Sequence, residues 1–191
     1  MNLRNPLIAL VLLLAWLPAY PQAIGIPDPG DIPLREPAEF PALPLDIRHD
    51  LERRGCRIPQ SQQADPNARS NVVSGRFGSA AQRDWAVLCS RNGDSSLLVY
   101  WRGDINDVLV EAGSPDMDWM QWQGPPEGWQ YTRYIATATP KMIRRLADAF
   151  GDPSELPVPL DHDGIEAGDS GKASTIRYWH HGQWIELTGM D

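Results

Sequence analysis

Residues 84–101, DWAVLCSRNGDSSLLVYW, are the stretch that decides the fold. Two runs rich in apolar, β-branched and aromatic residues flank an Asn-Gly pair, and this arrangement is typical of a tight β-hairpin. We therefore predict strands over Asp84–Ser90 and Ser96–Trp101. The rest of the chain is expected to pack around this hairpin.

Similar signals lie on both sides of the hairpin. Further strands are predicted at Asn71–Phe77, Asp107–Glu111 and Tyr131–Thr139, and a last hairpin at Ser174–Trp179 and Gln183–Leu187 about a His181-Gly182 turn. The connecting residues 113–130 are predicted to form a long loop, and residues 152–171 a turn-rich acidic segment.

Two short helices complete the expected fold. The first covers residues 45–54 and ends at Gly55, and the second starts after the cap Thr139 and ends at Gly151. Their expected apolar positions are Leu45, Ile47 and Leu51 in the first helix, and Ile143, Leu146, Ala147 and Phe150 in the second. The sequence thus predicts an α+β fold: a strand-dominated single domain of antiparallel hairpins over residues 46–191.

The first 23 residues have the pattern of a cleavable signal peptide. Arg4 precedes an apolar run from Leu7 to Leu17, and a Pro- and Ala-containing stretch ends at Ala23. Cleavage is expected after Ala23, with Ala19 as the second choice and an uncleaved anchor as the alternative. A run of this length is shorter than the roughly 20 residues that span a bilayer. We expect an exported protein, periplasmic or secreted, without a transmembrane anchor after processing.

Charge excludes two classes of partner. Without the leader the chain holds 16 Lys and Arg against 25 Asp and Glu, a formal charge of −9. Nucleic acids and anionic membranes both bind proteins through clusters of positive charge. We therefore expect neither as a partner, and consider instead a protein, small-molecule or glycan ligand.

Residues 24–45 hold six prolines, a density that interrupts both helices and sheets. This segment is predicted to be a Pro-rich tether between leader and domain, with a strap laid over the domain as the alternative.

Cys56 and Cys89 are the only cysteines. In an oxidising compartment, two cysteines most simply form one disulfide. Two free thiols or a catalytic thiol are the alternatives, but neither cysteine lies beside a histidine or in a CxxC pair.

Gly168-Asp169-Ser170-Gly171 matches the short string around the nucleophile of trypsin-like serine proteases. Such chemistry needs a histidine base, and the one early histidine is His49. The string continues with Lys172 rather than Gly-Pro, so an Asp/Ser/Gly turn is the simpler interpretation.

Calcium is a second possibility in the same region. Asp161, Asp163, Glu166 and Asp169 could supply oxygen ligands for a metal, although the pattern is only a partial calcium loop. The alternative is a turn with solvated acids. The adjacent His180 and His181 point to opposite faces of a strand, so we expect a surface pair rather than a zinc site.

Tryptophans divide into two groups. Trp85, Trp101, Trp179 and Trp184 lie on predicted strands and are expected in the core. Trp119, Trp122 and Trp129 fall in the predicted loop, where they could form a ligand platform. The alternative for these three is that they pack down onto the core.

The strands around DWAVLC and the C-terminal YWHHGQW hairpin resemble a family of short, secreted, uncharacterised bacterial proteins. The resemblance involves residues 56–101 and 161–191. It implies the Cys56–Cys89 disulfide and a single domain, and it implies no activity. The stretch from Gly75 to Val87 is also locally similar to one blade segment of FG-GAP repeats, which form propellers only as several blades.

These observations favour an exported, non-enzymatic binding or envelope-associated module of unknown ligand. The alternative is a secreted hydrolase that uses Ser170 or the acids of residues 161–169. Calcium is a possible cofactor.

Overall fold

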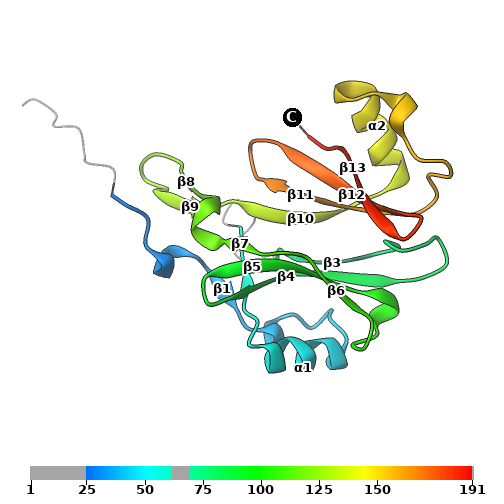
Figure 1. Cartoon of the computed structure of the whole chain (residues 1–191). Helices are drawn as coiled ribbons and strands as arrows, with labels where there is room; N and C mark the ends of the chain where they lie inside the picture. The colour runs from blue at the N-terminus through cyan, green and yellow to red at the C-terminus, as the bar shows by residue number, and fades with distance from the viewer. Residues whose placement is uncertain (1–24, 62–68, 191) are drawn as a thin grey trace, which may run out of the picture.

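A computed structural model describes residues 25–61 and 69–190 (Figure 1). The longer elements are α1 (Leu45–Arg54), β3 (Val72–Gly75), β4 (Asp84–Arg91), β5 (Asp94–Tyr100), β6 (Val108–Val110), β10 (Arg133–Ala138), α2 (Pro140–Phe150), β11 (Gly164–Asp169), β12 (Ser174–His180) and β13 (Gln183–Thr188). The shorter strands are β1 (Leu34–Arg35), β2 (Ile58–Pro59), β7 (Ser114–Pro115), β8 (Met120–Trp122) and β9 (Trp129–Tyr131). The predicted α+β class is confirmed. The predicted leader lies outside the described residues.

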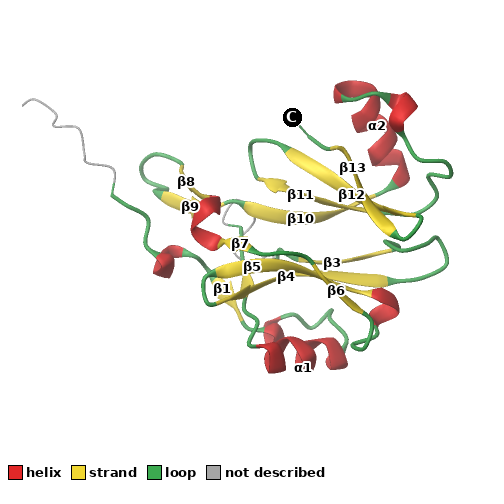
Figure 2. Ribbon diagram, viewed as in Figure 1, coloured by secondary structure: helices red, strands yellow, loops and turns green. Residues whose placement is uncertain are grey.

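Two antiparallel sheets face each other between the two helices (Figure 2). One sheet has the order β3-β4-β5-β6, with β7 also paired to β5, and the other has the order β10-β11-β12-β13. Helix α1 packs on the outer face of the first sheet, and α2 on the outer face of the second. The order of layers is therefore helix, sheet, sheet, helix.

The central strands β4 and β5 are buried on both faces. Val87 and Leu98 pack towards α1, whereas Leu88 and Leu97 pack towards the other sheet. A strand covered on both sides reads as a nearly continuous apolar run, which is the pattern seen from Trp85 to Cys89.

Both predicted hairpin turns are present. Asn92 and Gly93 have φ values of 56° and 86°, and His181 and Gly182 have values of 50° and 83°. Positive φ at both central residues is the geometry that matches the twist of the flanking strands. Both helices are also confirmed, with Thr139 accepting a hydrogen bond from the Met142 backbone at the start of α2.

Four expectations need correction. The predicted loop 113–130 contains β7, β8 and the start of β9, because these strands are too short to give a periodic signal. The acidic segment 152–171 contains β11, which is an inner strand of its sheet. Leu45 and Phe150 are 55% and 53% exposed, since each lies at a helix end beyond the buried stripe.

β11 escaped prediction because of its glycines, which are normally rare within strands. A Cβ at Gly164 would lie 2.6 Å from the Ile176 side chain, and one at Gly168 would lie 2.5 Å from the Ala173 carbonyl oxygen. The close approach of β12 therefore requires glycine at both positions.

The Pro-rich segment is a strap rather than a free tether from Ile32 onwards. Ile32, Pro37, Phe40 and Leu43 are buried, and β1 pairs with β2. Phe40 and Leu43 belong to the core between α1 and the first sheet. Apolar residues placed between the prolines thus fasten the segment to the domain.

A disulfide joins Cys56 and Cys89, with 5.0 Å between their Cα atoms. Both residues are buried in the core beneath α1. Across residues 25–61 and 69–190, no helix has the length and apolar character to cross a membrane.

Asn71 connects the two sheets at one edge. Its Nδ2 donates to the carbonyl oxygens of Pro59, at 2.7 Å, and Arg133, at 3.1 Å. Its Oδ1 accepts from the Ile135 backbone N–H at 3.0 Å. The side chain is 1% exposed, so these bonds form away from water.

Asp50 predicts how stability changes in acid. This 6%-exposed residue of α1 accepts hydrogen bonds from Arg54, at 2.6 Å, and from the Tyr100 hydroxyl, at 3.0 Å. Burial alone would raise the Asp50 pKa, but the Arg54 and Tyr100 hydrogen bonds and the arginine charges outweigh it and lower the pKa from the ordinary 3.8. The carboxylate therefore stabilises the fold above pH 3.8, and this contribution is lost as the pH falls through the lowered folded value.

We expect Asp50→Asn to lower the free energy of unfolding at pH 7 by about 1 kcal/mol and to make the acid side of the stability curve shallower. Urea unfolding between neutral and acid pH measures both effects. Asp46→Asn, at an exposed position of the same helix, is the matched control. If the free energy of unfolding falls in acid equally steeply for the wild type and Asp50→Asn, the role given to the Asp50 carboxylate is wrong.

Candidate functional site

Ser170 lies just after β11, beside a cavity of 480 Å³. The cavity lining also includes Glu166, Asp169 and Lys172, so the structure brings together several of the residues proposed for a hydrolase. All four histidines of the chain are described, and none lines this cavity. His49, the early histidine, lies on α1 in the opposite outer layer. The arrangement therefore offers Ser170 no histidine base.

The acids proposed as metal ligands instead take separate partners. Asp163 accepts from the Arg76 backbone at 2.9 Å, and Glu166 accepts from the hydroxyls of Tyr134, at 2.8 Å, and Ser174, at 2.7 Å. Asp169 contacts Gln121 and Lys172, and Asp161 is exposed. Among the residues that the structure describes, no three His, Cys, Asp or Glu side chains converge on a metal position.

Burial and the Glu166 hydrogen bond raise the pKa of Tyr134 to about 12. Tyr134 therefore keeps its proton at neutral pH and donates a hydrogen bond to Glu166. The contacts around Glu166 tie β10, β11 and β12 together.

The three loop tryptophans do not form one platform. Trp119 packs on a small core with Met120 and Tyr131, and its Nε1 donates to Ser114 at 3.0 Å. Trp122 is 38% exposed and meets Trp129 edge-to-face across the β8–β9 hairpin, with 5.9 Å between the ring centroids. Trp119 and Trp129 thus both pack on this small core, as the alternative predicted, whereas Trp122 is the exposed one of the three.

The strand tryptophans lie near or in the core as expected. Trp101, Trp179 and Trp184 cluster between the sheets, with ring centroids 5.0 to 5.7 Å apart. Trp85 is half-buried against the core beneath α1. His180 and His181 contact each other through their rings, at a centroid distance of 4.0 Å, on the β12–β13 turn.

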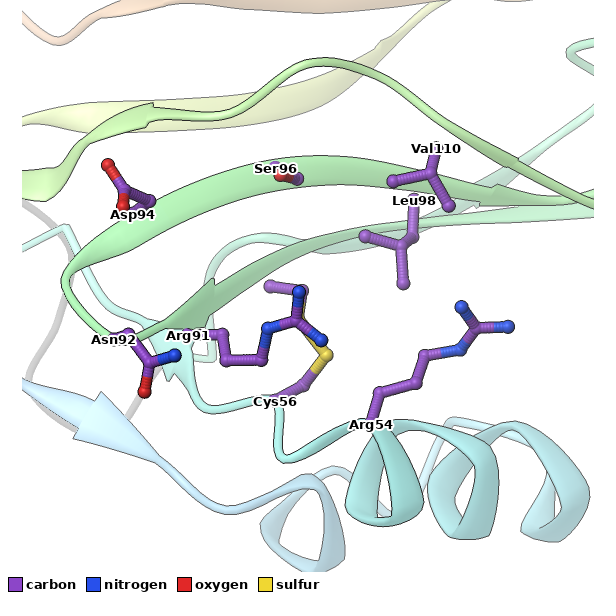
Figure 3. Close-up of a pocket in the computed structure, with 9 residues that line it drawn as sticks. Arg54, Cys56, Arg91, Asn92, Asp94, Ser96, Leu98 and Val110 are labelled. Carbon is purple, nitrogen blue, oxygen red and sulfur yellow. A yellow bond between two sulfur atoms is a disulfide. The ribbon is translucent and has the colours of Figure 1, made fainter.

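A different site lies beside the disulfide, in a cavity of 250 Å³ between the C-terminal end of α1 and the outer face of the first sheet (Figure 3). Its floor includes the disulfide, Leu98 and Val110. Arg54 reaches it from α1, and Arg91 from the end of β4. We call this space the arginine cavity. Its full lining is Arg54, Cys56, Cys89, Arg91, Asn92, Asp94, Ser96, Leu98 and Val110.

The two arginines differ in their partners. Arg54 is paired with Asp50. Arg91 is opposite Asp94 in the β4–β5 register, but Figure 3 shows its side chain running along the disulfide while Asp94 points elsewhere. Within the described part of the chain, Arg91 forms no salt bridge. The cavity therefore contains an arginine whose charge is available to a ligand.

A second cavity, of 380 Å³, adjoins the first and shares Arg91 and Asn92 with it. We call it the strap cavity, because Ile32 and Leu34 of the strap, together with Pro29 just before it, form one wall. Its other walls include Arg57, which is paired with Glu36, and the buried Asp116.

A buried polar cluster lies behind the strap cavity. Arg133 is 9% exposed, donates to the carbonyl and hydroxyl of Ser95 at 2.8 and 2.6 Å, and lies 4.8 Å from the Trp119 ring centroid. Burial lowers the pKa of Arg133. Burial also raises the pKa of Tyr131 to about 12, and the nearby charge of Asp116 adds to the rise. Arg133 and Tyr131 therefore both lie close enough to Asp116 to interact with its charge.

Sequence reasoning missed the arginine cavity, although the chain held a signal for it. Arg54 precedes Cys56 by two residues and Arg91 follows Cys89 by two. Arg91 and Cys89 both lie on β4, where residues two apart share a face, whereas Arg54 comes to the same side from the last position of α1, just before the Gly55 cap. The turn pattern of residues 91–94 concealed this role.

No protein-family model matches the chain, and no curated protein or solved structure shows significant similarity to it. A functional assignment therefore depends on the geometry of the molecule.

Proposed function

We propose that this chain is an exported, non-enzymatic binding module whose arginine cavity takes a small organic acid with an apolar body. The observation that carries the proposal is Arg91, a guanidinium without a salt bridge beside an apolar floor. A planar guanidinium matches a carboxylate through two parallel hydrogen bonds. The disulfide supports export, because such bonds persist in oxidising compartments.

Charge and shape favour an acidic ligand. The chain carries a net charge of −8, yet this cavity is lined by two arginines against one acid, Asp94, and Arg91 is the arginine that has no salt bridge. Leu98, which is 3% exposed, and Val110, which is 52% exposed, provide apolar surface for the ligand body. A few charged groups beside apolar surface are typical of small-molecule sites. The hydrolase alternative lacks a comparable arrangement, since its cavity offers Ser170 no histidine.

Hexanoate, with one carboxylate and a short apolar chain, is the probe for this proposal. We expect Arg91→Gln to weaken hexanoate binding about tenfold, because a charge-assisted hydrogen bond contributes about 1.5 kcal/mol or more. Isothermal titration calorimetry, or NMR titration if binding is weak, measures the affinity of the full chain.

Two further variants make the test specific. Arg145→Gln removes an equal charge from an exposed position on α2, on the far side of the molecule, and should leave the affinity unchanged. Arg91→Lys keeps the charge but loses the guanidinium fork, so it should recover only part of the affinity. Equal hexanoate binding by the wild type and Arg91→Gln, or none by either, would refute the proposal.

A further inference from the structure

We infer that the strap cavity binds a primary ammonium group through Asp116, so that the complete ligand is a zwitterion with its carboxylate on Arg91. The carboxylate part of this inference rests on the proposed function. The ammonium part rests on Asp116 alone.

Asp116 is held firmly in the cavity wall. It begins the 3-10 helix η4 (Asp116–Trp119) and is 2% exposed. Its backbone N–H donates to the Gly93 carbonyl at 2.8 Å, and the Ser90 hydroxyl donates to its Oδ2. The preceding residue, Pro115, is paired with Asp94 in the β5–β7 ladder. These contacts fix the carboxylate at the end of the β4–β5 hairpin.

One oxygen of this carboxylate has no partner. Asp116 Oδ1 is buried and accepts no hydrogen bond from any described residue. Its other oxygen receives only the neutral Ser90 hydroxyl, and Asp116 forms no salt bridge in the described ranges. The charge of Asp116 acts on the buried Arg133, but Arg133 donates its hydrogen bonds to Ser95 and Ser114 and forms no salt bridge with Asp116. Burying a carboxylate that has no hydrogen-bonded counter-charge is unfavourable. Asp116 therefore favours a ligand that brings both a donor and a positive charge.

A primary ammonium is the group that fits. It is a compact point charge with three donors, whereas a guanidinium is planar and larger. The strap side of the cavity supplies apolar walls from Pro29, Ile32 and Leu34 for the adjoining methylene groups. Met117 is half-buried in the same wall, and its unbranched, flexible side chain can adapt to a ligand.

Arg91 lines both the arginine cavity and the strap cavity, so one ligand can contact Arg91 and Asp116 together. A zwitterionic ligand whose carboxylate pairs with Arg91 can direct its chain away from Leu98 and Val110, into the strap cavity, and present its ammonium to Asp116. An ω-amino acid has this arrangement of groups. The matching chain length is found by comparing glycine, 4-aminobutyrate and 6-aminohexanoate.

The test compares the best-bound ω-amino acid with the fatty acid of the same chain length, using calorimetry or NMR titration on the full chain. We expect the wild type to bind the amino acid about tenfold more tightly than the fatty acid. Asp116→Asn should abolish this preference without changing fatty-acid affinity. Asp118→Asn, at an exposed position in the same 3-10 helix, should keep the preference.

The outcomes separate this inference from the proposed function. If the amino acid and the fatty acid bind equally to the wild type, the ammonium site is refuted. The effect of Arg91→Gln on hexanoate binding still tests the proposed function independently. If Asp116→Asn does not fold, hexylammonium and 1-hexanol are compared on the wild type. Tighter binding of hexylammonium supports the site, and equal binding overturns it.

Discussion

Replacing Cys56 and Cys89 together by alanine is expected to lower the free energy of unfolding by about 3–4 kcal/mol. The disulfide spans a sequence separation of 33 residues, and it restricts the unfolded chain by closing that loop. Both cysteines are buried between α1 and the first sheet, so the double variant also loses packing there. Urea unfolding of the oxidised wild type and the double variant measures the difference.

Reductant provides the control for this prediction. Dithiothreitol should destabilise the wild type by a similar amount and leave the alanine variant unchanged. The arginine cavity should change as well, because the disulfide forms part of its floor. Intact protein with two free thiols by mass spectrometry, and with wild-type stability, would contradict the structural role of the bridge.

Asn71→Ala is expected to cost about 3–4 kcal/mol of stability. The substitution leaves the carbonyl groups of Pro59 and Arg133 and the N–H of Ile135 without their side-chain partner. Each buried group left unpaired is unfavourable by about 1–3 kcal/mol. Asn71 also has a φ of 65°, a conformation that asparagine tolerates better than alanine. Thermal and urea unfolding measure the loss.

Asn106→Ala is the matched comparison for Asn71. Asn106 is exposed and its side chain bonds only to Asp104 within the same turn. Its replacement should change stability by less than about 1 kcal/mol. Similar losses for the two variants would show that Asn71 does not link the sheets as described.

Sequence reasoning identified the elements whose signals are local. The Asn92-Gly93 turn, the Gly55 end of α1 and the Thr139 start of α2 each depend on a few neighbouring residues, and all are present. β11 was missed because its glycines are required by close contacts along β12: Gly168 with Ala173, five positions later, and Gly164 with Ile176, twelve positions later. Contacts of that kind leave no periodic pattern in the strand itself.

The candidate site was harder to predict from the sequence than the fold, again because it depends on residues that are far apart in the chain. The GDSG string and the acids of residues 161–169 resemble functional motifs because they are close together in the sequence. In the structure the acids bind separate partners. Arg91 and Asp116 are 25 positions apart and looked like ordinary turn and loop residues. Only the folded chain shows that Arg91 lacks a salt bridge and that one carboxylate oxygen of Asp116 lacks a hydrogen-bond donor.

The position of the strap has a consequence for the order in which the chain folds. Phe40 and Leu43 are synthesised early, but they pack with Val87, Leu98 and Tyr100, which emerge about 45 to 60 residues later. Phe40 and Leu43 therefore cannot pack in this core until the β4–β5 hairpin has been synthesised. During that interval Cys56 has no second cysteine within the chain to react with, and when Cys89 arrives it is the only choice. A chain built this way can oxidise while it is still emerging without ever forming an incorrect internal disulfide.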